Sequence, residues 1–204
     1  MALGYMLMLT RRLLAVDQAV RLGHWPKPRG LGIYERQCGI FGFGAIGRGI
    51  GRRVKACGMS IMAFDPPLQA KGGLNEGPLA GTAFVDLEQL IAESDVVCLA
   101  CNLTTENRHI INAERFKAMK KDAILINVGR GPLIDEVALA AALEAGEIAG
   151  AGLDVFEVEP LLASSPLRTL PNVVLGSHNA NNLNSAVEHV HANTMNNLAE
   201  ILGK

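Results

Sequence analysis

Cys38-Gly-Ile-Phe-Gly-Phe-Gly-Ala-Ile-Gly47 is the stretch that decides the fold of this 204-residue chain. It carries an apolar run into a helical pattern over Ile46–Cys57 and places Gly42, Gly44 and Gly47 at the spacing G-x-G-x-x-G. In that spacing the first glycine permits a tight turn, the second lets a pyrophosphate approach the backbone, and the third lets the helix pack on the strand. The free N–H groups at the helix start then point at the phosphates. We expect a dinucleotide site here; the alternative is a glycine turn that binds no ligand.

On both sides of this turn, short apolar runs alternate with helical patterns. Apolar runs of this kind suit strands that are covered on both faces, and the alternation suits crossover units of a parallel sheet. The sequence therefore predicts an α/β fold, a doubly wound parallel sheet of the Rossmann type with helices on both faces. The predicted strands are Cys38–Gly42, Met59–Phe64, Val96–Ala100, Ala123–Asn127, Gly150–Val155 and Val173–Leu175, and the predicted helices are Leu3–Leu22, Ile46–Cys57, Leu87–Ala92, Ala113–Met119, Glu136–Ala145 and Asn182–Leu202.

An acidic residue ends the second apolar run, because Asp65 follows Met59–Phe64 and lies 18 residues after Gly47. A carboxylate at this place accepts hydrogen bonds from the adenosine ribose hydroxyls and repels a 2′-phosphate. Pro66 and Pro67 follow where an NADP site would favour Arg. The sequence therefore predicts NAD rather than NADP, and the alternative is a solvent-facing Asp65 without a ligand.

Composition and charge exclude several classes of protein. Hydrophobic residues make up 49% of the chain and charged residues 19%, so it is neither disordered nor collagen-like. The net charge of −1 gives no support to binding of nucleic acid or of an anionic membrane as a bulk property. The apolar stretch from Met1 to Leu9 is well short of the roughly 20 residues that a membrane span needs. It resembles no signal peptide either, so we expect a soluble, cytoplasmic protein.

Two of the four cysteines, Cys98 and Cys101, have the spacing of a redox motif or of half a zinc site. A zinc site needs a second pair or histidines at matching spacing, and none follows. We therefore interpret the pair as small apolar residues on a buried strand, in a reducing compartment, and predict no metal site.

Candidate catalytic side chains follow the later strands, where ligands bind in sheets of this kind. Arg130 lies on a glycine-flanked turn after Ala123–Asn127, where it is either solvated or able to clamp a carboxylate through two hydrogen bonds. Asp154, Glu157 and Glu159 follow the next strand. His178 follows the last short strand, and histidine is the natural proton carrier near neutral pH. On spacing alone, a structural and a catalytic role for His178 are evenly balanced.

Taken together, these motifs resemble the D-2-hydroxyacid dehydrogenase family. They run in order along the chain, and a further segment, Cys101-Asn-Leu-Thr104-Thr-Glu-Asn107, resembles the cofactor-facing loop of that family. The motifs that carry the resemblance are Gly42–Gly47, Asp65, Asn127-Val-Gly-Arg130-Gly, Asp154-Val-Phe-x-x-Glu159-Pro and His178.

The resemblance implies a reversible hydride transfer between NAD and C2 of a 2-hydroxy or 2-keto acid. Arg130 would bind the substrate carboxylate, His178 would be the acid/base, Glu159 its partner, and Asp154 would hold the nicotinamide carboxamide, whereas Glu157 would be a bystander. The resemblance also implies a homodimer that uses the first helix and its connector. The implied cofactor-binding residues are Gly42, Gly44, Ala45, Ile46, Gly47, Asp65, Asn102, Leu103, Thr104, Val128, Gly129, Arg130, Asp154 and His178.

Two departures from the family pattern qualify these expectations. The chain is short, so we expect residues 1–30 to be an interdomain helix and connector, residues 31–204 to be the NAD-binding domain, and the substrate-binding domain to be largely absent. Gly176-Ser177 also replaces the more familiar Thr-Pro before His178. The alternatives are a non-catalytic NAD-sensing module, as in corepressors of the same fold, and a degenerate fragment that does not fold stably.

Overall fold

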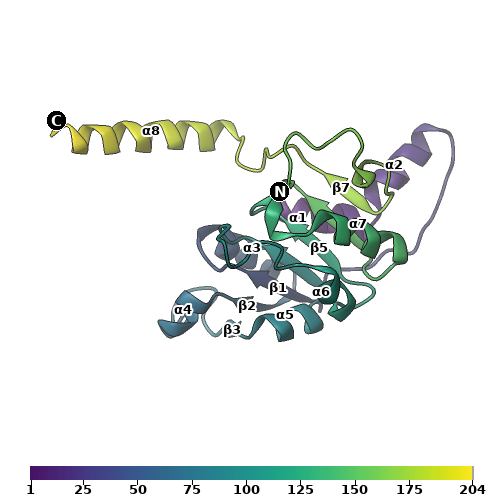
Figure 1. Cartoon of the computed structure of the whole chain (residues 1–204), viewed down its shortest axis with the longest axis horizontal. Helices are drawn as coiled ribbons and strands as arrows, with labels where there is room; N and C mark the ends of the chain where they lie inside the picture. Colours follow the sequence, from purple (N-terminus) through teal and green to yellow (C-terminus); the bar gives the residue numbers. More distant parts are fainter. Residues whose placement is uncertain (204) are drawn as a thin grey trace.

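A computed structural model describes residues 1–203, without the side chains of Ser185, Val187 and His189. Seven parallel strands form one sheet in the order β3-β2-β1-β4-β5-β6-β7 (Figure 1). The strand order reverses between β1 and β4, which is where such sheets bind ligands. The predicted doubly wound sheet is confirmed. The strands are β1 (Gln37–Phe41), β2 (Ser60–Phe64), β3 (Ala83–Phe84), β4 (Val96–Leu99), β5 (Ile124–Asn127), β6 (Gly150–Leu153) and β7 (Val173–Leu175).

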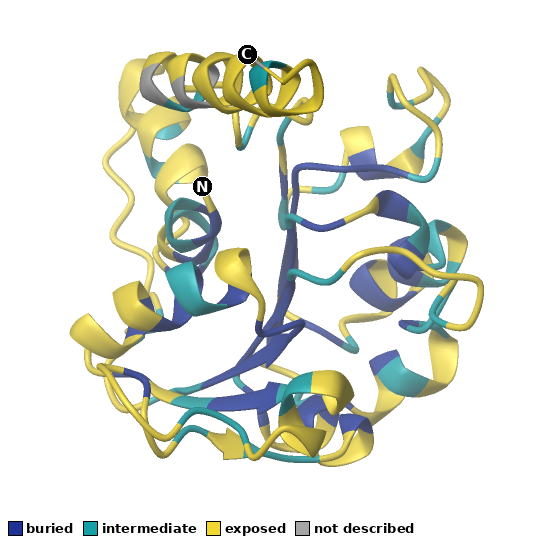
Figure 2. Cartoon of the chain, turned by 90° about the vertical axis from the view of Figure 1, so that its left-hand side faces the viewer, coloured by how far each residue is buried: buried dark blue, intermediate teal, exposed yellow. Residues whose placement is uncertain are grey.

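Helices cover both faces of the sheet and create two apolar layers. The helices α1 (Ala2–Thr10) and α3 (Ala45–Ala56) pack on one face, and α5 (Leu87–Glu93), α6 (Ala113–Ala118) and α7 (Glu136–Ala145) pack on the other. Figure 2 shows the strands buried between helices whose outer surfaces are exposed. Strands β4, β5 and β6 are buried along their whole length, which explains why their sequences are apolar apart from Asn127 at the end of β5.

The predicted single helix over Leu3–Leu22 is wrong, because the chain breaks at Arg12. Arg12 has a left-handed backbone, with φ of 51°, and a second helix, α2 (Leu13–Arg21), starts after it. The apolar residues continue through the break at helical spacing, so the periodicity alone does not reveal it. None of the residues of α2 is buried, and the helix projects from the body (Figure 1).

Two further helices, α4 and α8, follow β2 and β7. The short helix α4 (Pro66–Ala70) begins directly after Asp65, whose Oδ1 accepts a hydrogen bond from the Leu68 N–H at 3.0 Å. The helix α8 (Asn184–Ile201) extends away from the sheet (Figure 1), close to its predicted bounds of Asn182–Leu202. Asp135 caps the start of α7, and Gly146 ends it in a left-handed conformation, as their residue types predict.

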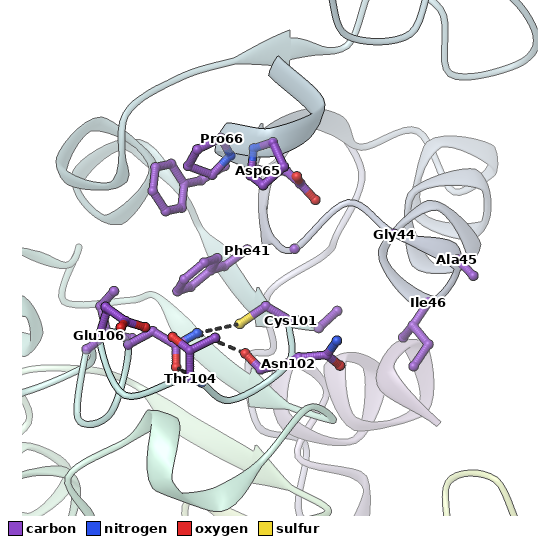
Figure 3. Close-up of a pocket in the computed structure, with 16 residues that line it drawn as sticks. Phe41, Gly44, Ala45, Ile46, Asp65, Pro66, Cys101, Asn102, Thr104 and Glu106 are labelled. Atoms are coloured by element: carbon purple, nitrogen blue, oxygen red, sulfur yellow. Dashed lines mark hydrogen bonds between the residues drawn. The ribbon is translucent and has the colours of Figure 1, made fainter. Parts of the chain in front are cut away.

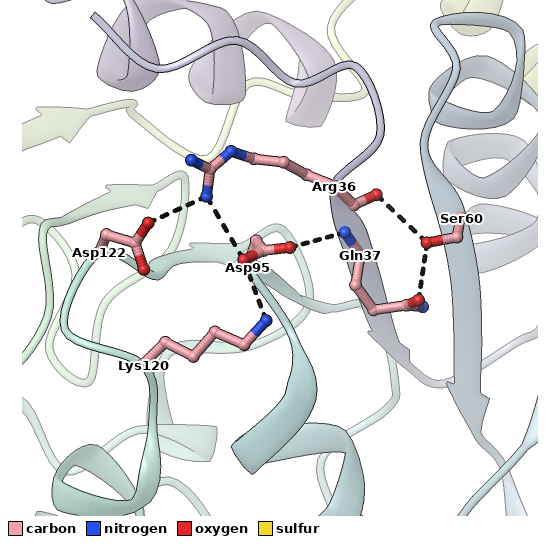
Figure 4. Close-up of polar contacts among 6 residues, drawn as sticks. All are labelled: Arg36, Gln37, Ser60, Asp95, Lys120 and Asp122. Carbon is pink, nitrogen blue, oxygen red and sulfur yellow. Dashed lines mark hydrogen bonds and ion pairs between the residues drawn. The ribbon is translucent and has the colours of Figure 1, made fainter.

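A network of charged side chains closes the edge of the sheet at which β1 begins (Figure 4). Asp95 is its centre: Oδ2 accepts the Gln37 N–H at 2.8 Å, and Oδ1 lies 3.0 Å from Lys120 Nζ and 3.3 Å from Arg36 Nη1. Arg36 Nη1 also contacts Asp122 Oδ2 at 3.0 Å. Burial alone would raise the pKa of Asp95, but the Gln37 N–H, Lys120 and Arg36 together hold the pKa below its ordinary value.

We expect Asp95→Asn to lower the free energy of unfolding at pH 7 by about 1–3 kcal/mol, because it removes a charge from these donors. A depressed carboxyl pKa contributes stability that is present above the unfolded pKa of about 4. That contribution disappears as the pH falls through the lower folded pKa, so the difference from wild type should shrink below about pH 4. Urea unfolding at several pH values measures this. Asp17→Asn is the control, because the Asp17–Arg21 pair is exposed. A difference that persists unchanged at low pH would contradict the assignment.

Candidate active site

The glycine turn has the geometry that its sequence predicts. Gly42 has a φ of 87°, and a Cβ there would lie 2.6 Å from the backbone nitrogen of Cys101. A Cβ on Gly47 would lie 2.0 Å from the carbonyl oxygen of Gly42, so α3 packs directly on the turn. A Cβ on Gly44 would meet nothing within 4 Å. The backbone at Gly44 is therefore open to a ligand, at the start of a twelve-residue helix.

A cavity of about 640 Å³ lies beside this turn, at the carboxyl ends of β1, β2 and β4 (Figure 3). The cofactor-binding residues predicted from the sequence that line the cavity are Gly42, Gly44, Ala45, Ile46, Asp65, Asn102 and Thr104. The other predicted cofactor-binding residues lie outside its lining, and they are Gly47, Leu103, Val128, Gly129, Arg130, Asp154 and His178. The cavity also has apolar walls that were not predicted from the sequence, and these include Phe41, Phe64 and Ile110.

Asp65 connects the cavity to the glycine turn. Its Oδ2 accepts the Phe43 N–H at 2.7 Å, while its Oδ1 caps α4. Each oxygen keeps a lone pair that a ribose hydroxyl can use. The double backbone contact fixes the carboxylate at the mouth of the cavity. The sequence carried the signal for the cap, an Asp followed by Pro at the first helical position.

Asn107 gives the other wall of the cavity its shape. Its Oδ1 accepts the Thr104 N–H at 2.7 Å, and its Nδ2 donates to the carbonyl oxygen of Asn102 at 2.8 Å. Side-chain bonds of this kind organise loops without secondary structure. The loop that carries Asn102, Leu103 and Thr104 is therefore ordered from within.

His178 and Glu159 meet after β7 and β6, as the sequence analysis expected from the resemblance. His178 Nδ1 lies 2.7 Å from Glu159 Oε2, and Glu159 Oε1 accepts the Phe156 N–H at 3.0 Å. Burial alone would raise the pKa of Glu159, but the bonds to His178 and Phe156 and the charge of Arg130 hold it below its ordinary value. A carboxylate that remains charged orients the imidazole ring through its contact with Nδ1. The pair leaves His178 Nε2 as the ring nitrogen that can exchange a proton with a ligand.

Arg130 lies exposed on the turn after β5. Asn127, which is buried, accepts the Gly129 N–H at 3.0 Å and donates to the carbonyl oxygen of Arg130 at 2.9 Å. A Cβ on Gly131 would lie 1.9 Å from the carbonyl carbon of Phe156, so this turn packs directly against the segment that leads to Glu159. Val128 and Gly129 form the base of the turn.

Asp154, at the end of β6, is only 1% exposed. Its Oδ1 accepts the Tyr5 hydroxyl at 3.1 Å and the Asn179 N–H at 3.3 Å, and its Oδ2 accepts the Ala180 N–H at 2.9 Å. One lone pair on Oδ2 is left for a further donor. The contact of Tyr5 could not be predicted from the sequence, because residues 149 positions apart carry no local signal of contact.

Glu157 does not contact His178, but it is held by contacts with Glu136 and His109. Its Oε1 accepts the Glu136 N–H at 3.0 Å, and the Glu157 N–H donates to Glu136 Oε1. Its Oε2 lies 2.8 Å from His109 Nε2 and 3.3 Å from Arg108 Nη2. Burial, with Glu157 and Glu159 nearby, raises the pKa of Glu136. The start of α7 and the segment before Glu159 therefore hold each other.

The described part of the chain contains neither a group of metal ligands nor a helix that could cross a membrane. Among the side chains that the structure describes, no three His, Cys, Asp or Glu residues are grouped so that they could hold a metal ion. Within residues 1–203, every helix is too short or too polar to cross a membrane. The four cysteines are free, and Cys38 and Cys98 are buried on the sheet.

The fold and the site together define a dinucleotide-binding domain that carries a histidine–carboxylate pair and an arginine at the ends of its later strands. Residues 3–180 match the D-isomer specific 2-hydroxyacid dehydrogenase family over its NAD binding domain. The chain belongs to this family.

Three similar proteins illustrate the relationship. The glyoxylate/hydroxypyruvate reductase B of Cronobacter sakazakii (strain ATCC BAA-894) is 44% identical over 176 residues, which are 82% of this chain and 52% of that protein. A crystal structure of a glyoxylate reductase from Paecilomyes thermophila superposes with a TM-score of 0.87 at 32% identity, covering 100% of this chain and 61% of that one. The D-lactate dehydrogenase of Aquifex aeolicus, solved with NAD and lactic acid, gives a TM-score of 0.84 at 27% identity, covering 99% and 65%. The chain thus spans about half the length of the curated relatives it matches.

Proposed function

We propose that this chain is the cofactor-binding half of an NAD-dependent oxidoreductase that acts on D-2-hydroxyacids. The observation that carries the proposal is the His178–Glu159 pair, which lies with Arg130 at the same edge of the sheet as the cavity beside Gly44. A proton carrier, an anion clamp and a phosphate-facing helix start are the parts that reversible oxidation of a 2-hydroxyacid needs. The names of the relatives support a short substrate, with glyoxylate as the first to test.

NAD fits the residues present, because the open backbone at Gly44 suits a pyrophosphate and Asp65 suits ribose hydroxyls. When bound, NAD supplies the hydride acceptor, and its reduced form supplies the hydride. In oxidation His178 takes the proton of the C2 hydroxyl through Nε2, and Glu159 stabilises the imidazolium that forms. Arg130 binds the substrate carboxylate and fixes C2. In the proposed assignment Val128, Gly129 and Leu103 line the cofactor, and Asp154 holds the carboxamide.

The first test is a titration with NADH and with NADPH. We expect saturable NADH binding and a clear preference over NADPH, because the Asp65 carboxylate repels a 2′-phosphate. Asp65→Arg should weaken the binding of NADH by about tenfold or more. It should also reverse the preference, so that NADPH binds more tightly than NADH, since Arg accommodates the 2′-phosphate.

Asp86→Arg is the matched control for this substitution. Asp86 caps α5 as Asp65 caps α4, but it lies outside the cavity. A folded chain that binds neither nucleotide would contradict the proposed site. Binding of NADH without reduction of any 2-keto acid would instead favour the NAD-sensing module.

We also propose a homodimer formed through α2 and the connector that follows it. Exposed apolar side chains support this, since α2 buries nothing and carries Leu13, Leu14 and Val20 on its surface, with Leu22 and Trp25 beyond it. Sedimentation equilibrium should give twice the chain mass of 21.7 kDa.

The free cysteines support a reducing, cytoplasmic location.

A further inference from the structure

Tyr5 is a buried tyrosine whose hydroxyl reaches from the first helix to the end of β6. The side chain is 3% exposed, and its hydroxyl donates to Asp154 Oδ1 at 3.1 Å. Burial, and after it the charge of Asp154, raise the pKa of Tyr5 far above the physiological range. The hydroxyl therefore remains a donor wherever the protein is folded.

Asp154 in turn holds the turn that carries His178. Its main-chain oxygen accepts the His178 N–H at 2.7 Å, and its carboxylate accepts the N–H groups of Asn179 and Ala180. His178 has a φ of 55°, a left-handed conformation that is unfavourable for a residue with a side chain. Three successive N–H groups thus depend on one residue, and they keep His178 in that conformation.

Gly176 leaves the space that this arrangement needs. A Cβ at this position would lie 2.2 Å from the Tyr5 hydroxyl oxygen and 2.3 Å from Asp154 Oδ1. The residue therefore has to be glycine while Tyr5 reaches Asp154. This gives a physical reason for the Gly176-Ser177 sequence, which departs from the Thr-Pro pattern of the family.

We propose that Tyr5 is a positioning residue for His178 and acts through Asp154, with Gly176 as the required gap. The proposal rests on the proposed function, in which His178 is the acid/base. Tyr5 touches neither substrate nor cofactor in this assignment. It supplies the side-chain donor that fixes a buried carboxylate, and the carboxylate fixes the main chain of the His178 turn.

Amide hydrogen exchange, read by NMR on the chain without any nucleotide, tests this contact. Tyr5→Phe keeps the ring and removes the donor. We expect the amides of His178, Asn179 and Ala180 to exchange about tenfold faster or more, while the amides of β4 and β5 keep their wild-type rates. The resonance of the proton shared by His178 Nδ1 and Glu159 should broaden as the pair loosens.

Two further variants make the test specific. Gly176→Ala reaches the same contact from the other side, and it should accelerate exchange at the same three amides. Tyr34→Phe is the matched control, because Tyr34 is 68% exposed and packs against Gly58 rather than against Asp154. It should change nothing.

Wild-type exchange rates at all three amides in Tyr5→Phe would overturn the proposal. Equal acceleration throughout the sheet would also overturn it, because that would indicate a merely structural side chain. Failure of the wild-type chain to bind NADH would refute the proposed function but would leave the exchange result readable.

Discussion

Replacing His178 with alanine should lower kcat/KM for reduction of a 2-keto acid by NADH about 10³-fold, within the 10²–10⁴ range of general acid–base catalysis. The reason is specific to this site. His178 Nδ1 is engaged by Glu159 at 2.7 Å, so Nε2 is the group that delivers the proton to the developing alkoxide. The decrease in NADH absorbance during glyoxylate reduction measures this loss of kcat/KM.

The dissociation constant for NADH should change little in the same variant, because the cavity beside Gly44 does not include His178. The kcat/KM of Glu159→Gln should lie between those of the wild type and His178→Ala. The substitution keeps the contact with His178 but removes the charge that stabilises the imidazolium formed in the reaction. His191→Ala is a suitable control, because His191 lies exposed on α8. An unchanged kcat/KM in His178→Ala would exclude the proposed acid/base.

The second large effect is expected at the glycine turn. Gly47→Ala should destabilise the chain by about 3 kcal/mol or more and abolish NADH binding, because overpacking at a rigid backbone contact cannot be relieved by a rotamer change. The added Cβ would lie 2.0 Å from the carbonyl oxygen of Gly42 and 3.2 Å from Ile40 Cγ2. Either α3 moves off the sheet or the turn opens, and both outcomes destroy the phosphate-facing geometry.

Gly49→Ala, two residues along the same helix, is the matched control. A Cβ there would come no closer than 3.6 Å, to Arg53 Nη1. Alanine is a better helix former than glycine, so this variant should gain about 0.5–1 kcal/mol. Urea unfolding compares the two. Equal stabilities would show that the contact between α3 and the turn carries no energetic weight.

The sheet could be predicted from the sequence because its signals are local. Runs such as Val96–Leu99 and Ile124–Ile126 are unbroken and apolar, and each is followed by a turn and a helical pattern. The glycine spacing fixed one end of the cavity for the same reason. The two-residue strand β3 has no periodicity to detect, and it was missed.

The rest depends on contacts that no local pattern carries. The break at Arg12 lies inside a continuous apolar periodicity, so only the left-handed backbone of one residue reveals it. The Tyr5–Asp154 bond joins residues that are 149 positions apart in the sequence. The contact of Asp65 Oδ2 with the Phe43 N–H depends on how the glycine turn folds back onto β2.

Glu136 and Glu157 each accept the main-chain N–H of the other, and Gly131 has no room for a side chain against Phe156. In directed evolution, the effects of substitutions at these positions are expected to be coupled, because the residues contact one another. A single substitution at Gly131, Glu136 or Glu157 is expected to be lost in selection unless its neighbours change with it. Libraries that aim to alter substrate preference should therefore keep these positions constant and randomise the exposed surface around Arg130.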